Sequence, residues 1–295
     1  MMEDTEGLTI AFHAMRERLF GLAYRMLGSY ADAEDVLQDT WLRLADANVE
    51  VKNSDAYLRT VVTRLCLDQL KSARVQREQY VGPWLPEPII PANNFSPDNA
   101  AELADNLSFA LLLTLEKLTP PERAAFLLHD VFERPFAEIA DILGKKQSAC
   151  RQLATRARKA VRSNISAQAV PSTDHEKLFS LFSQAISTGN ADALKSLLRD
   201  DVIAYSDGGG LKQAALRPIF GADKVTRLFM TFSKNTTDDI ATIRGVLARI
   251  NGAPGVLIYI NEILEQTLSV EITGNRISAI YMVRNPEKLR HLTRQ

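Results

Sequence analysis

The sequence is poor in cysteine and lacks long apolar runs. Its two cysteines, Cys66 and Cys150, lie far apart inside stretches of helical periodicity and match neither metal-ligand nor redox spacing. No segment approaches the roughly 20 apolar residues of a membrane-spanning helix. Residues 1–4 are acidic, unlike an export leader. We therefore expect a cytoplasmic protein without disulfides, cofactor or metal.

The formal charge is balanced, with 35 basic and 36 acidic residues, but its distribution is uneven. One segment crowds basic side chains against only Glu138 and Asp141. Its basic residues are Lys145, Lys146, Arg151, Arg156, Arg158, Lys159 and Arg162. Any nucleic-acid binding is therefore expected to be local.

A chain of 295 residues is long for one compact domain, and its first part has the pattern of three helices. Apolar residues recur at helical spacing from about Thr9 to Leu27, and Gly28 ends the pattern. Ser29 begins a capping signal for a second helix, and a third begins near Ser54. Their apolar stripes predict three helices around one small core.

Residues 80–91 interrupt the helical pattern with four prolines and are interpreted as a linker. This linker is unusually apolar, since it contains Trp84, Leu85, Ile89 and Ile90. We expect it to dock on a protein surface.

The next part of the chain predicts a helix-turn-helix. Residues 119–122 form a capping box for a helix that runs to about Phe132. Pro135 is expected at the first position of the following helix, and Gly144 at its left-handed end. A basic helix then covers about residues 147–163. A helix, a glycine turn and a basic helix are typical of this motif.

In a helix-turn-helix the second helix lies in the major groove, with its first residues at base edges and flanking cations at phosphates. The candidates for base edges are Lys146, Gln147, Ser148, Arg151 and Gln152. The candidates for phosphate or domain-surface contacts are Arg156, Arg158 and Lys159. The alternative is a basic face that is merely solvated.

The C-terminal part changes from helices to strands. Helices are expected at about residues 178–186 and 194–198, after a polar stretch. Strand-like alternation follows in residues 202–206, 240–250, 255–262, 264–272 and 276–283, with a hairpin turn at residues 274–275. Helices followed by consecutive antiparallel strands predict an α+β domain with a curved sheet wrapped around a helix.

Two segments resemble a known family. Residues 33–42, AEDVLQDTWL, resemble the polymerase-binding helix of extracytoplasmic-function (ECF) sigma factors. Residues 136–144, FAEIADILG, with residues 156–158 downstream, resemble the promoter-reading domain of the same family. The order and separation of the two segments make the resemblance specific.

The resemblance extends to a subgroup with a SnoaL-like C-terminal extension. It is carried by residues 80–88 (YVGPWLPEP), 207–210 (DGGG) and 285–289 (NPEKL). Two departures are small: a leucine stands before Lys212, and Cys150 replaces a Val-like residue. The resemblance thus covers nearly the whole chain.

The resemblance implies two all-α domains followed by an α+β, SnoaL-like (nuclear transport factor 2-like) cone-shaped domain. The predicted boundaries are 1–79 for sigma region 2, 80–100 for a proline-rich linker, 101–165 for the region 4 helix-turn-helix, 166–173 for a second linker and 174–295 for the SnoaL-like domain.

The resemblance also implies partners and contact residues. Core RNA polymerase would be bound through its β′ clamp helices and β flap, and promoter DNA through its −35 and −10 elements. The polymerase-docking residues would be Asp35, Gln38, Asp39 and Leu42. The alternative is that the two acids only solvate a helix face.

The first domain is also expected to open the promoter, which requires stacking surfaces and cations around an extruded base. Residues 45–57 occupy the position of the base-capturing loop of the family. Asn53 is the candidate for a base edge, and Tyr57 for stacking or for the core. The candidates for contacts to the non-template strand are Arg59, Arg64, Lys71 and Arg74.

The C-terminal domain is expected to regulate the helical domains by contacting the linker, because two weak DNA contacts on one tether depend on its geometry. The expected contact residues are Tyr80, Trp84, Leu85, Pro86, Asp207, Gly208, Gly209, Gly210, Asn285, Pro286 and Leu289. The alternative is that the glycines form an ordinary turn and Pro286 an ordinary terminator.

Two other classes of function remain open from the sequence. One is a DNA-tethered cyclase or isomerase of the SnoaL type, for which Asp207, Tyr205, Tyr259 and Tyr281 are the available polar groups. The apolar pocket of such a domain would bind a small effector or be filled by side chains. The other class is a plain DNA-binding repressor, against which the polymerase-docking helix argues.

Overall fold

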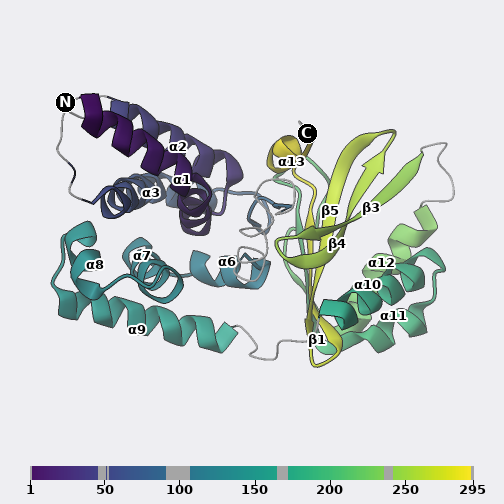
Figure 1. Cartoon of the computed structure of the whole chain (residues 1–295). Helices are drawn as coiled ribbons and strands as arrows, with labels where there is room; N and C mark the ends of the chain where they lie inside the picture. Colours follow the sequence, from purple (N-terminus) through teal and green to yellow (C-terminus); the bar gives the residue numbers. More distant parts are fainter. Residues whose placement is uncertain are drawn as a thin grey trace. The chain divides into compact units, whose positions relative to one another are not determined.

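The computed structural model describes residues 2–45, 51, 53–90, 107–164, 172–235 and 242–293. Contacts divide the chain into two compact units, residues 1–79 with 110–165 and residues 80–109 with 166–295 (Figure 1). We call them the helical unit and the C-terminal unit. The first residues of the predicted linker thus group with the C-terminal unit, while the boundaries of independent domains stay a prediction. None of the described helices is long and apolar enough to cross a membrane.

The helical unit begins with the three expected helices. They are α1 (Met2–Leu27), α2 (Tyr30–Ala45) and α3 (Ser54–Glu78). Gly28 has a φ of +70°, and the hydroxyl of Ser29 accepts a 3.1 Å hydrogen bond from the amide of Asp32. Helix α1 begins at Met2 and not at the expected Thr9, since its first turns contain too few apolar residues to show a stripe.

The helix-turn-helix is also confirmed. Its elements are α6 (Phe109–Glu116), α7 (Pro120–Phe126), the π-helical turn η1 (Leu127–Val131), α8 (Phe136–Leu143) and α9 (Gln147–Asn164). Thr119 and Glu122 form the expected capping box. The expectation for Pro135 was wrong by one position, because its extended ψ of 146° makes it the N-cap of α8. Gly144 ends α8 with a left-handed φ of +61°.

The C-terminal unit contains four helices and a six-stranded sheet among its described residues. The helices are α10 (Ser172–Ser187), α11 (Ala191–Leu197), α12 (Ala222–Asn235) and α13 (Pro286–Thr293). The strands are β1 (Leu198–Asp207), β2 (Ile219–Phe220), β3 (Ile243–Ile250), β4 (Ala253–Ile260), β5 (Ile263–Thr273) and β6 (Arg276–Val283). Sequence analysis missed α12, β2 and α13.

The sheet has the strand order β2-β1-β6-β5-β4-β3. Strands β3 to β6 form the expected antiparallel meander, and Gly274 and Asn275 provide the two positive φ angles of the turn before β6. Strand β1, however, pairs parallel with β6, which corrects the expectation of antiparallel strands only. The long crossover through α12 and the meander makes this pairing possible.

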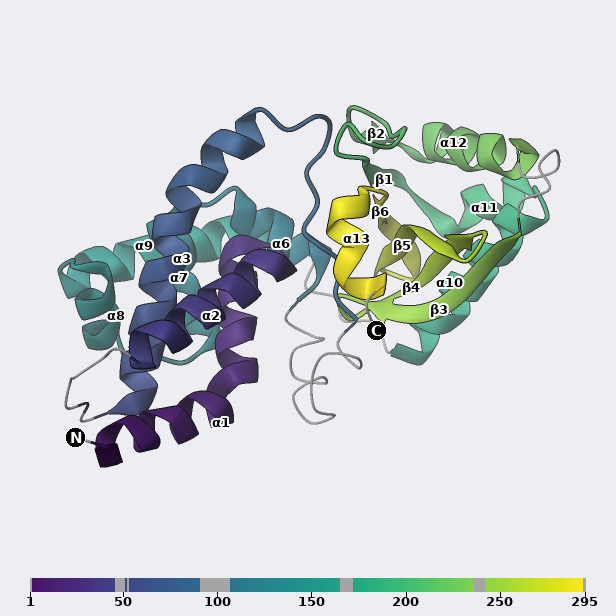
Figure 2. The ribbon, with the colours of Figure 1, turned by 90° about the horizontal axis from the view of Figure 1, so that it is seen from above.

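The two faces of the sheet have different coverings. Helices α10, α11 and α12 pack on one face, where the rings of Phe182 and Phe229 lie 5.4 Å apart in the core. Helix α13 lies on the other face (Figure 2). Because side chains alternate along a strand, Val202 and Ala204 enter the helix-covered core, whereas Tyr205 and Asp207 point to the face near α13. The core between the sheet and helices α10, α11 and α12 therefore consists of buried apolar side chains from both layers.

Candidate functional site

Helix α2 presents the four predicted polymerase-docking residues on one exposed face. Asp35, Gln38, Asp39 and Leu42 follow the i, i+3, i+4, i+7 spacing, and all four are exposed. Leu42 is a large apolar side chain that is 54% exposed. The opposite face of α2 is buried in the core of the three helices. This mixture of acidic and apolar groups on a rigid helix is suited to binding another protein.

The start of α9 presents the five candidates for base edges. Lys146, Gln147, Ser148, Arg151 and Gln152 are all exposed there. The guanidinium of Arg151 lies 5.5 Å from the ring centre of Phe136, whose ring in turn lies 4.0 Å from that of His129. The Arg151 guanidinium therefore lies within range of a cation–π contact with an aromatic pair of the preceding elements.

The later residues of α9 are partly used inside the helix-turn-helix. Arg156 forms a 3.0 Å ion pair with Glu122, and Arg158 forms a 2.6 Å ion pair with Asp130. Lys159 is exposed. The first two side chains therefore already serve as domain-surface contacts, one of the two roles that the sequence left open for them.

The candidates on α3 and before it have several different environments. Asn53 caps α3, since its side-chain oxygen accepts a 3.1 Å hydrogen bond from the amide of Ala56. Tyr57 is half-buried, and Lys71 is exposed beside Asp68 at 2.7 Å. Residues 46–50 and 52 of the predicted base-capturing loop, and the side chain of Arg74, lie outside the described residues.

Arg59 and Arg64, the other two candidates on α3, contact the helix-turn-helix. Arg59 is buried and lies 3.6 Å from the Glu138 carboxylate. Arg64 donates to the main-chain oxygens of Asp141 at 3.1 Å and Ile142 at 3.4 Å. In this structure Arg59 is therefore buried against the helix-turn-helix, whereas Arg64 contacts it from an exposed position.

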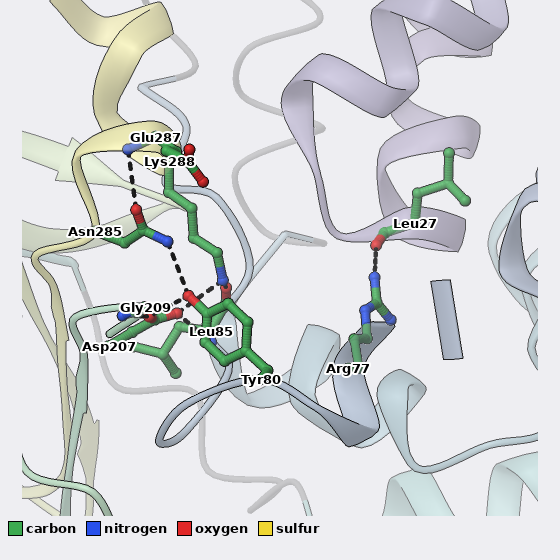
Figure 3. A network of polar contacts seen from close by, with 9 residues as sticks. All are labelled: Leu27, Arg77, Tyr80, Leu85, Asp207, Gly209, Asn285, Glu287 and Lys288. Atoms are coloured by element: carbon green, nitrogen blue, oxygen red, sulfur yellow. Dashed lines mark hydrogen bonds and ion pairs between the residues drawn. The ribbon is translucent and has the colours of Figure 1, made fainter. Parts of the chain in front are cut away.

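The start of the predicted linker is bound by a buried polar cluster, which we call the linker clasp. It consists of Tyr80 and Leu85 from the linker and Asp207, Asn285 and Lys288 from the rest of the C-terminal unit (Figure 3). The Tyr80 hydroxyl donates to one Asp207 oxygen at 2.6 Å, and the Leu85 amide donates to the other at 2.8 Å. Asn285 donates to the Tyr80 oxygen at 2.9 Å.

The clasp is centred on a buried ion pair. The Lys288 ammonium lies 2.7 Å from the carboxylate of Asp207, which has no exposed surface. The same ammonium lies 4.7 Å from the ring centre of Tyr80 and 4.4 Å from that of Trp84. Burial and the Asp207 carboxylate raise the pKa of Tyr80 well above its ordinary value, so its hydroxyl remains a donor.

The glycines after Asp207 bring the backbone close to the clasp. The Gly209 amide donates to Asp207 at 3.1 Å. A Cβ on Gly209 would lie 2.3 Å from the Asn285 side-chain nitrogen and 3.0 Å from the Tyr80 hydroxyl. Gly210 contacts Val81 in the same way, since its Cβ would lie 3.3 Å from that side chain. These glycines allow this close approach, and they also form a turn, since the Leu211 amide donates to the Gly208 carbonyl at 2.9 Å.

A second set of contacts binds the linker farther along. The amide of Ile89 donates to the Asn251 side chain at 3.0 Å, and the Asn251 side chain donates to the Leu107 carbonyl at 3.0 Å. The ring of Phe109 stacks on Tyr281 with centres 5.0 Å apart. The predicted linker, and residues 107 and 109 beyond its predicted end at residue 100, therefore contact the rest of the C-terminal unit.

The other predicted contact residues lie close to the clasp. Trp84 is half-buried, whereas Leu85 and Pro86 are buried. Pro286 begins α13, which corrects its reading as a terminator, and Leu289 is buried on that helix. Gly208 contacts the loop that follows it, because its Cβ would lie 2.2 Å from the Lys212 carbonyl.

Sequence reasoning missed Lys288 and Asn251 as contact residues. Lys288 lies inside the motif of residues 285–289 that carried the family resemblance, and this position was the signal that could have identified it. Asn251 precedes Gly252 in a turn between two strands, where asparagine is ordinary. In the part of the chain that the structure describes, no three His, Cys, Asp or Glu side chains gather closely enough to hold a metal ion.

Comparisons with known proteins show which family the chain resembles. Two family models match, Sigma-70 region 2 at residues 11–75 and Sigma-70 region 4 at residues 108–161. The ECF RNA polymerase sigma factor SigJ of Mycobacterium tuberculosis is 37% identical over 288 residues, covering 94% of this chain and 91% of the relative. The probable ECF RNA polymerase sigma factor SigI of the same organism is 32% identical, and the match covers 98% of this chain and 97% of that relative.

A solved structure matches nearly the full length as well. The crystal structure of M. tuberculosis SigJ superposes with a TM-score of 0.77 at 33% identity, covering 96% of this chain and 98% of that one. The likeness therefore includes the C-terminal unit as well as the helices.

Replacing Gly209 by alanine is expected to release the linker, because the new Cβ would overlap Asn285 and Tyr80. In a Trp41→Phe background, Trp84 is the remaining tryptophan, and its emission should shift to the red. Gly221→Ala is the matched control, since Gly221 also has a positive φ but its Cβ would meet nothing nearer than 3.7 Å. Both variants have backbone strain of about 1–2 kcal/mol. Equal spectra from the two folded variants would contradict the role of Gly209.

Proposed function

The chain belongs to the ECF RNA polymerase sigma factors, and on that premise we propose that it brings core RNA polymerase to promoters under the control of its own C-terminal domain. The observation that carries the regulatory part is the linker clasp around Asp207. The three parts of this function are polymerase binding, promoter reading and control of the tether.

Polymerase binding is assigned to the exposed face of α2. Asp35 and Asp39 supply negative charge, and Leu42 supplies an apolar group that a partner can cover. The proposed partner surface is the β′ clamp helices, with the β flap contacted by the helix-turn-helix. Association through a few charged groups and one apolar anchor is typical of a reversible interface.

Promoter reading is assigned to α9 and α3. The exposed start of α9 would read the −35 element through Arg151 and its neighbours. Asn53, Tyr57 and the basic residues of α3 would contact the −10 element after the strands separate. These contacts require that the two helical segments lie at the correct distance on DNA.

Control of this distance is assigned to the C-terminal domain. A flexible tether gives the second DNA contact an effective concentration that depends on the length and stiffness of the tether. The clasp holds Tyr80, two residues after the end of α3, and the Tyr281 contact holds Phe109 at the start of α6. Holding Tyr80 and Phe109 on one domain would limit how far apart the two helical segments can lie, so a change in the clasp would change promoter output.

The enzyme reading is not favoured by the environment of its candidate groups. Asp207 would be the candidate base, but both of its oxygens accept hydrogen bonds within the clasp. Burial and Glu271 raise the pKa of Tyr281, and its hydroxyl donates to Glu271 at 2.7 Å. These side chains serve the linker contact and are not positioned for a substrate.

Run-off transcription with bacterial core polymerase tests the proposal. Promoter-dependent transcripts are expected from the full chain, and an altered amount is expected from a version that ends near Ser163. Absence of any transcript with every promoter would reject the sigma function. Equal amounts of transcript from both versions would reject regulation by the C-terminal domain but would leave the sigma function in place.

Replacing Leu42 by alanine should weaken binding to core polymerase about tenfold, since burying a leucine side chain contributes about 1.5–3 kcal/mol. Ile10→Ala is the matched control, because Ile10 is also an exposed apolar residue, at 64%, on the neighbouring helix α1. Affinity for labelled core enzyme is the measurement. Identical affinities for the two variants would remove Leu42 from the interface.

Replacing Arg151 by alanine should cost about 1–3 kcal/mol of discrimination at one base pair of the −35 element. Lys159→Ala, farther along the same helix, should weaken binding evenly across sequences and reduce its salt dependence. Competition binding with single-substituted duplexes distinguishes the two. An even loss for Arg151→Ala would make this residue a phosphate contact.

A further inference from the structure

Strand β3 is a free edge of the six-stranded sheet (Figure 2). It is the last strand in the sheet order, and among the described residues it pairs with β4 alone. Its register with β4 runs without a bulge from Ile243 to Ile250. The strand at the other edge, β2, has only two residues. Strand β3 therefore offers a long row of unpaired backbone groups to another strand.

The turn after β3 decides which of its backbone groups face outward. Asn251 and Gly252 both have positive φ angles and form a two-residue hairpin turn. Ile250 and Ala253, on either side of this turn, therefore form a hydrogen-bonded pair, and such pairs alternate along an antiparallel ladder. The amides and carbonyls that point away from β4 are consequently those of residues 243, 245, 247 and 249.

Exposed apolar side chains accompany this edge. Leu247 is 75% exposed, more than any other large apolar side chain in the part of the chain that the structure describes. Ile243, on the same face of β3, is 47% exposed. The register places Ile243 opposite Ile260 and Ile260 opposite Ile263, which is 62% exposed, so the apolar surface continues onto β4 and β5. Apolar surface beside unpaired backbone favours association with another strand.

The two arginines of β3 do not protect the edge in the way that free charges protect other edge strands. Arg244 forms a 2.9 Å ion pair with Glu262 and lies 4.4 Å from the ring centre of Tyr259. Arg249 forms a 3.4 Å ion pair with Glu176. Both charges are thus paired within their own chain, and neither one repels an approaching strand as an isolated charge would.

The residues of β3 are complementary to a second copy of themselves. Two antiparallel copies related by a twofold axis at Leu247 would place Leu247 opposite Leu247. In the same register Gly245 would lie opposite Arg249, and Arg244 opposite Ile250, so no like charges would be opposed. A glycine inside a regular strand is often a site of close approach by another backbone, and here it would leave room for the arginine of the second copy.

Other registers lack this complementarity. Opposite residues of antiparallel strands share a face, so the twofold axis must pass through a residue. An axis at Val246 would place Leu247 opposite Gly245, and an axis at Ala248 would place Leu247 opposite Arg249. In both cases the most exposed leucine would lose its apolar partner.

We propose that the chain forms a homodimer in which β3 pairs antiparallel with β3 of a second copy, across a twofold axis at Leu247. The outward amides and carbonyls would form the new ladder, and the two Leu247 side chains would cover each other. A contact made by one strand of each copy belongs to the small interfaces, below about 1,200 Å², so the dimer is expected to dissociate reversibly. The inference does not depend on the proposed function and adds a second copy of the chain as a partner.

Sedimentation velocity of the full chain at a series of concentrations tests the dimer. We expect a reversible equilibrium between monomer and dimer. Leu247→Lys should weaken dimerisation at least about tenfold, because each dimer loses an apolar pair and gains two like charges at its axis. Phe220→Lys is the matched control, since Phe220 is also exposed, at 59%, on the opposite edge strand, and it should leave dimerisation unchanged.

A charge exchange makes the test independent of folding defects. Leu247→Glu alone should also be monomeric, because two carboxylates would meet at the axis. In an equal mixture of Leu247→Lys and Leu247→Glu, a lysine faces a glutamate, and heterodimers should form. A misfolded variant would not regain association in this way.

Three results would overturn the inference. The first is a wild-type chain that stays monomeric at every concentration, and the second is a dimer that Leu247→Lys leaves intact or that Phe220→Lys abolishes. The third is a mixture of the two charged variants that sediments no faster than either variant alone. Loss of dimer in each charged variant, with its return in the mixture, would support pairing at Leu247.

Discussion

The contact between the linker and the C-terminal domain depends on one buried carboxylate. Asp207 has no exposed surface, and each of its oxygens accepts two hydrogen bonds, from Tyr80 and Gly209 on one side and from Leu85 and Lys288 on the other. A buried charge is tolerated only when it is fully paired, and removing one partner leaves a cost of several kcal/mol. Because two of the four donors belong to the linker, linker and domain stabilise each other.

The strand order explains why these groups meet. Parallel pairing places Asp207, the last residue of β1, beside Val283, the last residue of β6. The chain then turns directly into α13, which brings Asn285 and Lys288 close to the end of β1 and so to Asp207. If β1 ran antiparallel to β6, the end of β1 would lie beside the start of β6, far from the end of β6 that leads into α13. The unexpected topology is thus a condition for the clasp.

Sequence patterns predicted the elements of this fold better than its contacts. Helical periodicity, the capping box at Thr119 and the glycine at Gly144 were local signals, and they predicted the helix-turn-helix correctly. The docking of Leu85 and Ile89 was predicted because apolar residues in a proline-rich stretch need a surface. The role of Asn251 depends on a residue more than a hundred positions away, and no local pattern records it.

The side chain of Asn251 forms two hydrogen bonds, one with Ile89 and one with Leu107, and this pairing has a structural consequence. It joins two points of the chain that are separated by residues 90–106. Because the side chain of one residue holds both points, the positions of Ile89 and Leu107 depend on each other through Asn251. A substitution at Asn251 would release both points at once.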